Sequence, residues 1–230
     1  GIGGGFKGNG GTVTVSGGIA TAAGGSYGAG IGGGFKGNGG TVTVSGGIAT
    51  AAGGSYGAGI GGGFKGNGGT VTVSGGTVTA TGSSYSAGIG DGLSGNGGTF
   101  STGENGNAVI VASSISDQSG KASTSTTPWS GLIIEGTAGA LYGTSVTPTA
   151  DFTVPAGDTV AIEKDDSTAQ TLTVASGITM TNDGDITVKR GDSLVIDGTL
   201  VNNGSISIED GGTVVNHGTI TRKTLPALTA

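Results

Sequence analysis

The segment GGTVTVSGG occupies residues 10–18 and recurs unchanged at residues 39–47 and 68–76. Within it, valine alternates with threonine, which is the period of two expected for a β-strand with one buried face. Identical strands at a constant spacing fit strands that stack in register, with the valines facing inward and the threonines facing outward. The segment therefore predicts a stacked β-structure rather than a flexible glycine-rich linker.

The repeat that carries this segment is 29 residues long. Residues 1–29 return unchanged at 30–58, and a third copy at 59–87 differs at five positions. Each copy also holds a strand-like run that starts at Ile19 in the first copy, and a third run, AGIGGG, around Ile31. Glycines separate the runs, as sharp corners require. Three short strands per rung predict an all-β parallel β-helix, a β-solenoid, and the general preference of parallel crossovers makes a right-handed coil the expectation.

Several side chains recur at the repeat spacing and are expected to form columns along the coil. An asparagine column fits shared hydrogen bonds at a turn, and a phenylalanine column that ends in Leu93 fits a hydrophobic ladder. A tyrosine column fits rings about one strand spacing apart, and a lysine column fits a solvated, like-charged edge. The residues are Asn9, Asn38, Asn67 and Asn96; Phe6, Phe35 and Phe64; Tyr27, Tyr56 and Tyr85; and Lys7, Lys36 and Lys65.

The pattern changes in the second half of the chain. NAVIVASSIS and WSGLIIEG fit buried strands joined by a polar stretch, and a period of 20 residues follows Asp151. In that period we align Val174 with Leu194 and Val214, Met180 with Leu200 and Ile220, and Ile186 with Ile206. The expected regions are a solenoid with 29-residue rungs at 1–102, transition rungs at 103–150 with a polar loop at 117–128, a solenoid with 20-residue rungs at 151–224, and a tail at 225–230.

Composition excludes several classes of function. The 230 residues include 56 glycines and no cysteine, so thiolate metal sites, thiol nucleophiles and disulfides are ruled out. The net charge is −6 and the lysines and arginines do not cluster, which argues against nucleic acid as a partner. No apolar stretch approaches the ~20 residues of a membrane span, so we expect no membrane insertion.

The pattern of ionisable residues predicts neither catalysis nor a metal site. Glycan-active β-helix enzymes need clustered carboxylates, whereas here stacking at 20 residues would only bring Asp183 near Asn203. His217, the single histidine, occupies a turn position in VNHG. The NDGD segment lacks the remaining carboxylates of a calcium loop. We therefore expect no catalytic residues, no bound metal and no cofactor.

The order of these blocks resembles the glycine-rich repeat regions of large secreted or cell-surface adhesin-like proteins of anaerobic, often gut-dwelling, bacteria. The resemblance covers nearly the whole chain and is carried by AGIGGG, GNGGTVTVSGGTVTATG, GNAVIVASSISDQSG, WSGLIIEGTAGALYGTSVT, DFTVPAGDTVAI and NNGSI. It implies an extracellular β-solenoid module of a longer surface protein and carries no catalytic motif. The closing segment TLPALTA lacks the Leu-Pro-x-Thr-Gly order of a sortase signal.

The leading functional expectation is a non-catalytic structural module, a stiff stalk or spacer at the bacterial cell surface or outside the cell. Its first repeat does not look like a capping rung, so we expect either that the chain is part of a longer array or that it stacks end to end into filaments. The alternative is a carbohydrate-binding module that uses the tyrosine column or the loop that carries Trp129. Two remoter alternatives are an ice-binding face made of the Thr-x-Thr rows and a polysaccharide-active enzyme.

Overall fold

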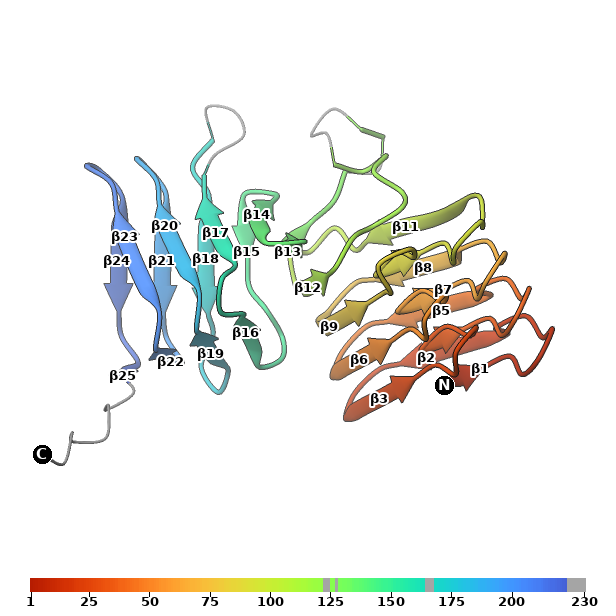
Figure 1. The fold of residues 1–230 in the computed structure, drawn as a ribbon. Coiled ribbons are helices and arrows are strands. Elements are labelled where there is room, and N and C mark those ends of the chain that lie inside the picture. Colours follow the sequence, from red (N-terminus) through yellow and green to blue (C-terminus); the bar gives the residue numbers. More distant parts are fainter. Residues whose placement is uncertain (122–124, 127, 164–167, 223–230) are drawn as a thin grey trace, which may run out of the picture.

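The structure is a computed structural model (Figure 1). It describes residues 1–230 except 122–124, 127, 164–167 and 223–230, so the predicted tail at 225–230 lies outside the described residues. The described chain consists of 25 strands, turns and irregular segments, and contains no helix. Most strands pair in parallel, and the architecture is compatible with the predicted β-solenoid.

The first half of the chain forms an array of parallel strands with a 29-residue spacing, the N-terminal array. Thr12 pairs with Thr41 and Thr41 with Thr70, so identical residues of successive copies lie side by side. Three sheets result, with the strand orders β1-β4-β7-β10, β2-β5-β8-β11 and β3-β6-β9-β12. The strands are β1 (Ile2–Gly3), β2 (Thr12–Val15), β3 (Ile19–Ala23), β4 (Ile31–Gly32), β5 (Thr41–Val44), β6 (Ile48–Ala52), β7 (Ile60–Gly61), β8 (Gly69–Val73), β9 (Gly76–Thr81), β10 (Ile89–Gly90), β11 (Gly98–Thr102) and β12 (Ala108–Ala112).

Side chains alternate across these strands as the sequence predicts. In β5, Val42 and Val44 are buried whereas Thr41 is exposed, which confirms that the valines face inward. The inner positions of β6 hold alanines, so the space between the sheets is narrow there. Ile31 and its counterparts in later copies form a buried column, and the larger Phe100 and Trp129 join this core beyond the third repeat. The core of the first three repeats is therefore built from valine, alanine and one isoleucine column.

The direction of the chain reverses between β13 (Gly131–Glu135) and β14 (Ala138–Tyr142), which form the one antiparallel pair among the described strands. Gly136 and Thr137 make the two-residue loop, and Gly136 has a φ of 66°, a conformation that hairpin turns of this length need and that glycine adopts without steric cost. β12 and β13 still pair in parallel, so the third sheet continues unbroken through the reversal and grows to nine strands.

The hydrophobic interior changes sides of this nine-stranded sheet at the same place. Ile110 and its partner Ile133 belong to the core of the N-terminal array. Their neighbours Leu132 and Ile134 point to the opposite face and belong, with Leu141, to a second core. From β13 to β14 the strand direction inverts, and the hydrophobic core moves to the opposite face of the sheet. New strands nevertheless continue to be added at the same edge of the sheet. Since each inversion alone would change the hand of a coil, the two together preserve it.

The second core belongs to the C-terminal array, which forms the other side of the molecule in Figure 1. Its strands form two four-stranded sheets and the remainder of the nine-stranded sheet. The 20-residue alignments of Met180 with Leu200 and Ile220 are confirmed. The strands are β15 (Ser145–Val146), β16 (Phe152–Val154), β17 (Thr159–Ile162), β18 (Thr171–Val174), β19 (Thr179–Asn182), β20 (Asp185–Val188), β21 (Ser193–Ile196), β22 (Thr199–Asn202), β23 (Ser205–Ile208), β24 (Thr213–Asn216) and β25 (Thr219–Arg222).

One predicted alignment is wrong by two residues. Leu194 pairs with Leu172, and Val174 pairs with Ile196. The reason is the connection from β18 to β19, which has the four residues 175–178, whereas the next repeat connects β21 to β22 with only two, 197 and 198. The 20-residue period therefore begins only at β19.

Candidate binding surfaces

Two tight turns in each 29-residue repeat carry the aromatic side chains at the surface. Gly8 donates a backbone hydrogen bond to Gly5 across the first turn, which holds Phe6 and Lys7. Gly28 donates to Gly25 across the second turn, which holds Tyr27. Because the repeats stack in register, each turn lies directly over its counterpart in the next copy. We call the surface formed by the phenylalanine, lysine and tyrosine positions of the first three repeats the aromatic edge.

Rings of the aromatic edge form two interlocked columns. Phe6 and Phe35 stack with centroids 5.3 Å apart and an interplanar angle of 4°, and Tyr27 and Tyr56 stack at 5.3 Å and 15°. Edge contacts tie the columns together: Tyr27 meets Phe35 at 5.4 Å and 78°, and Tyr56 meets Phe64 at 5.6 Å and 62°. The columns are therefore one packed unit rather than independent side chains.

This stacking changes what the tyrosine column can bind. A sugar ring packs its CH face against an aromatic face, but ring faces inside a column are occupied by the next ring. Tyr56 is partly buried between two neighbours, while Tyr27 remains 46% exposed and Tyr85 68% exposed. A sugar that contacts Tyr27, Tyr56 and Tyr85, as predicted, can therefore reach mainly the edges of the rings. A free ring face remains only at the end of the column.

The lysines of the aromatic edge adopt an unusual backbone conformation. Lys7, Lys36 and Lys65 have φ values of 61°, 58° and 58°, in the left-handed region. For an L-residue other than glycine, asparagine or aspartate this conformation costs about 1 kcal/mol or more. Each ammonium group lies over the ring of the preceding phenylalanine, 5.3–5.5 Å from its centroid, a distance that suits a cation–π contact.

The asparagine column runs beside the aromatic edge. The side-chain oxygen of Asn9 accepts a hydrogen bond from the backbone nitrogen of Asn38 at 2.9 Å, and Asn38 does the same for Asn67 at 3.0 Å. Asn67 in turn accepts from Asn96 at 2.9 Å. The column therefore links side chain to backbone from copy to copy. The side-chain oxygens of Asn9, Asn38 and Asn67 already accept hydrogen bonds within the chain.

Trp129 is not at the surface, so its side chain is not available for the predicted glycan contact. The side chain is only 2% exposed and packs edge-on against Phe100 and Tyr142, with centroids 5.3 Å away in each case. It closes the core of the N-terminal array next to the chain reversal. Its indole nitrogen has no hydrogen-bond partner within the described part of the chain. The apolar character of the neighbouring GLII run was the signal that this region is interior.

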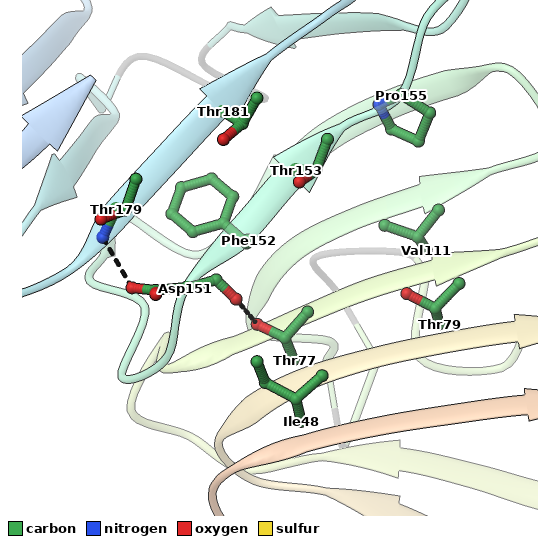
Figure 2. Close-up of a pocket in the computed structure, with 10 residues that line it drawn as sticks. All are labelled: Ile48, Thr77, Thr79, Val111, Asp151, Phe152, Thr153, Pro155, Thr179 and Thr181. Atoms are coloured by element: carbon green, nitrogen blue, oxygen red, sulfur yellow. Dashed lines mark hydrogen bonds between the residues drawn. The ribbon is translucent and has the colours of Figure 1, made fainter. Parts of the chain in front are cut away.

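A groove that the sequence did not predict lies where the two arrays meet (Figure 2). It exists because the interior changes sides there, so the outer face of β9 lies beside β16 and β19. The hydroxyl of Thr77 donates to the backbone oxygen of Asp151 at 2.8 Å, and the Asp151 carboxylate accepts from the backbone of Thr179 at 2.7 Å. The groove has a volume of about 310 Å³. It is lined by Ile48, Thr77, Thr79, Val111, Asp151, Phe152, Thr153, Pro155, Thr179 and Thr181.

Ionisable side chains of the C-terminal array pair along the stacking direction. Asn203 donates to Asp183 at 2.7 Å, as its predicted position above it requires. His217 lies 2.8 Å from Asp197, at a turn. Hydrogen bonding to Glu209 raises the pKa of Lys189. Among the described residues, no three His, Asp or Glu side chains are grouped closely enough to hold a metal ion.

Comparison with known proteins does not assign the chain to a family. No protein-family model, curated protein or solved structure matches it. No helix among the described residues is long and apolar enough to cross a membrane.

Proposed function

We propose that this chain is a non-catalytic structural module, a stiff β-solenoid that serves as a stalk or spacer of an adhesin-like bacterial protein outside the cell or at its surface. The observation that carries the proposal is the register of the N-terminal array. Identical residues pair strand after strand, as in Val13 with Val42 and Val42 with Val71. Repeats that contact only their neighbours allow length to change without any change in chemistry.

Continuity between the arrays supports stiffness. The nine-stranded sheet runs from β3 to β23 through the chain reversal, so backbone hydrogen bonds join the two repeat types without a linker. We take each repeat as one rung of three short strands, wound in the right-handed sense that parallel crossovers prefer. The length of such a rod grows by one strand spacing, about 4.8 Å, per rung.

End-to-end stacking into filaments is part of the proposal. Ile2 is 39% exposed in the first repeat, whereas its counterpart Ile31 is fully buried. At the other end of the described chain, Ile208 and Ile220 are 53% and 46% exposed. Apolar side chains beside strand edges favour association with a second β-surface, which can be a further repeat of the same protein or another copy of this chain.

Deletion of one complete repeat tests the proposal. Removing residues 30–58 should leave the register intact, because the residues that become adjacent are the same as before. We expect an unchanged circular dichroism spectrum and, by small-angle X-ray scattering, a rod shorter by about 4.8 Å. The matched control removes residues 43–70, one fewer, which joins Val42 to Val71 within a strand and turns the following valines to the outer face. A flexible chain, or equal tolerance of both deletions, would contradict a register-locked stalk.

Electron microscopy tests the filament component separately. Negatively stained full-length chain should form filaments at micromolar concentration, and Ile2→Asp should disperse them into short rods. Short rods in both samples would remove end-to-end stacking from the proposal and leave the spacer.

A further inference from the structure

Charge is divided unevenly along the chain. Residues 1–90 contain three lysines and no aspartate or glutamate, so their side chains carry +3. Since the whole chain carries −6, residues 91–230 carry −9. All three positive charges of the first region lie in one column on the aromatic edge. An edge of one sign on a rod whose remainder has the other sign is typical of a surface that meets an oppositely charged partner.

The backbone conformation of these lysines argues that their side chains are needed. The third position of a turn with positive φ favours glycine, and glycine fills 12 of the 29 positions in the first repeat. Lysine nevertheless occupies this position in three successive copies. A residue held in a costly conformation points to a role for its side chain.

In the fourth copy this arrangement stops. Ser94 occupies the lysine position, again with positive φ, and Leu93 replaces the phenylalanine. Asp91 replaces the equivalent glycine, and its carboxylate accepts a hydrogen bond from the backbone of Gly68 at 2.8 Å. The turn conformation thus persists without the lysine, so the fold does not require the positive charge.

The aromatic edge also fixes where the charges sit. Each ammonium group is held over a phenylalanine ring, and these rings stack at 5.3 and 5.7 Å. The three ammonium groups therefore form a row that repeats at about one strand spacing, near 4.8 Å. A row of this kind is preorganised for a linear chain that carries one negative charge per unit of similar length.

We propose that the aromatic edge, through Lys7, Lys36 and Lys65, binds a linear acidic polysaccharide that carries one carboxylate on each sugar. The carboxylates pair with the ammonium row, and the sugar rings lie along the edges of the tyrosine column. This surface adds a binding activity to the structural role proposed above and does not depend on it.

Single-stranded nucleic acid fits this surface less well, although it is also a linear polyanion. Proteins bind single strands by stacking bases on exposed aromatic faces. Here the faces inside the columns are covered by neighbouring rings, as for Tyr56 between Tyr27 and Tyr85. An acidic sugar chain needs only the ammonium groups, which pair with its carboxylates, and the exposed ring edges, which contact its sugar rings.

Binding of the intact chain to polymannuronate and to unsubstituted mannan tests the proposal. The two polymers share their sugar, and only the first carries a carboxylate on each ring. By isothermal titration calorimetry in low salt with EDTA, we expect binding to polymannuronate and none to mannan. The logarithm of the affinity should fall against the logarithm of salt concentration with a slope of about −2, as three charge contacts at roughly −0.7 each imply.

Matched charge variants locate the surface. Lys7→Gln, Lys36→Gln and Lys65→Gln combined should weaken binding about tenfold or more, the loss expected when three exposed ion pairs are removed together. The same positions changed to arginine should retain binding. The control Lys121→Gln, Lys189→Gln and Arg190→Gln removes the same charge from outside the aromatic edge and should bind like the parent chain.

Three results would overturn the proposal. The first is binding of mannan as tight as that of polymannuronate, which would mean that the carboxylates do not contribute to binding. The second is unchanged binding by the triple glutamine variant while its circular dichroism matches the parent, which would place the site elsewhere. The third is single-stranded DNA binding as tightly as polymannuronate, which would make the partner class wrong.

Discussion

The N-terminal and C-terminal arrays stack strands in the same way but use their residues differently. The N-terminal repeat is nine residues longer, yet alanine is frequent in its core beside valine and isoleucine, whereas in the core of the C-terminal array leucine takes the place of alanine. Residues 1–102 hold 40 of the 56 glycines. The longer repeat therefore does not enclose a larger interior. Its additional residues form the two turns that carry the aromatic edge.

The contrast teaches that repeat length alone says little about core size in stacked β-structures. In the N-terminal array the backbone itself is packed against backbone at the turns, so glycine is needed for contact between copies. In the C-terminal array side chains fill the space, so hydrophobic volume matters more. The following predictions test this difference, from the largest expected effect to the smallest.

A methyl group at a stacked turn should be the most damaging change. The Cβ of Gly34→Ala would overlap the carbonyl oxygen of Gly5 in the preceding copy, so we expect a loss of about 4 kcal/mol in the free energy of unfolding. Urea titration followed by circular dichroism measures it. Gly5→Ala is the matched control, because the same local sequence there faces open space. Equal losses for both variants would mean that backbone contact between copies is not limiting.

Truncation of a core side chain should cost more in the C-terminal array. Leu194 is fully buried, and Leu194→Ala should lower the free energy of unfolding by about 3 kcal/mol. Val44 is equally buried in the N-terminal array, but Val44→Ala removes one carbon fewer and should cost about 2 kcal/mol. Thermal unfolding of the two variants compares them. A larger loss at Val44 would reverse our view of which core depends on side-chain volume.

Loss of one member of the asparagine column should have a moderate effect. Asn67→Ala removes the acceptor of the Asn96 backbone nitrogen, and we expect a loss of about 1 kcal/mol. Hydrogen exchange at the Asn96 amide should speed up in this variant. Asn96→Ala leaves the bonds of the column intact and should change stability less. Unchanged exchange at that amide would show that water replaces the side chain without cost.

Acidification should change the stability contributed by Asp117 and by Asp158 in opposite directions, because the pKa of one is lowered and that of the other is raised. Burial acts to raise the pKa of Asp117, but hydrogen bonds from the backbone of Phe100 and Ser119 outweigh it and lower the pKa below its ordinary 3.8. The stability that Asp117 contributes is therefore present above pH 3.8 and is lost as the pH falls through the lowered pKa. Asp117→Asn should destabilise the chain by less than about 1 kcal/mol at pH 7, and the difference should shrink near pH 3.

Asp158 in the C-terminal array is the control for this pH dependence. Burial raises the pKa of its carboxyl group, so its ionisation opposes folding once the pH exceeds the ordinary value. Asp158→Asn should remove that penalty and flatten the loss of stability between pH 4 and pH 7. Parallel pH profiles for the two asparagine variants, followed by thermal unfolding, would contradict the opposite signs.

Much of the N-terminal array is predictable from sequence because each copy repeats the same local rule. The Thr-Val alternation indicates which side chains face inward, and the 29-residue spacing correctly predicts that Phe6 lies beside Phe35. The positive φ of Lys7 is not predictable, since lysine gives no local sign of a left-handed turn. The two-residue error at Val174 arises because a four-residue connection was aligned with a two-residue one.

The chain reversal could not be predicted, although its signal was present. The runs around Val109 and Leu132 are apolar at consecutive positions, which means that both faces of these strands are covered. That pattern is compatible with a core on each side, but it does not say that strand direction inverts between β13 and β14. The groove in Figure 2 follows from the inversion, so it was equally hidden, and so was the burial of Trp129.

The direction of the backbone hydrogen bonds has a mechanical consequence. They run along the axis on which the strands stack, so tension between the two ends of the chain pulls each ladder apart directly instead of shearing it. We therefore expect the stack to resist bending but to yield to traction one repeat at a time. Stretched in an optical trap, the chain should lengthen in steps of about 100 Å from the 29-residue repeats and about 70 Å from the 20-residue repeats, at roughly 3.5 Å per residue.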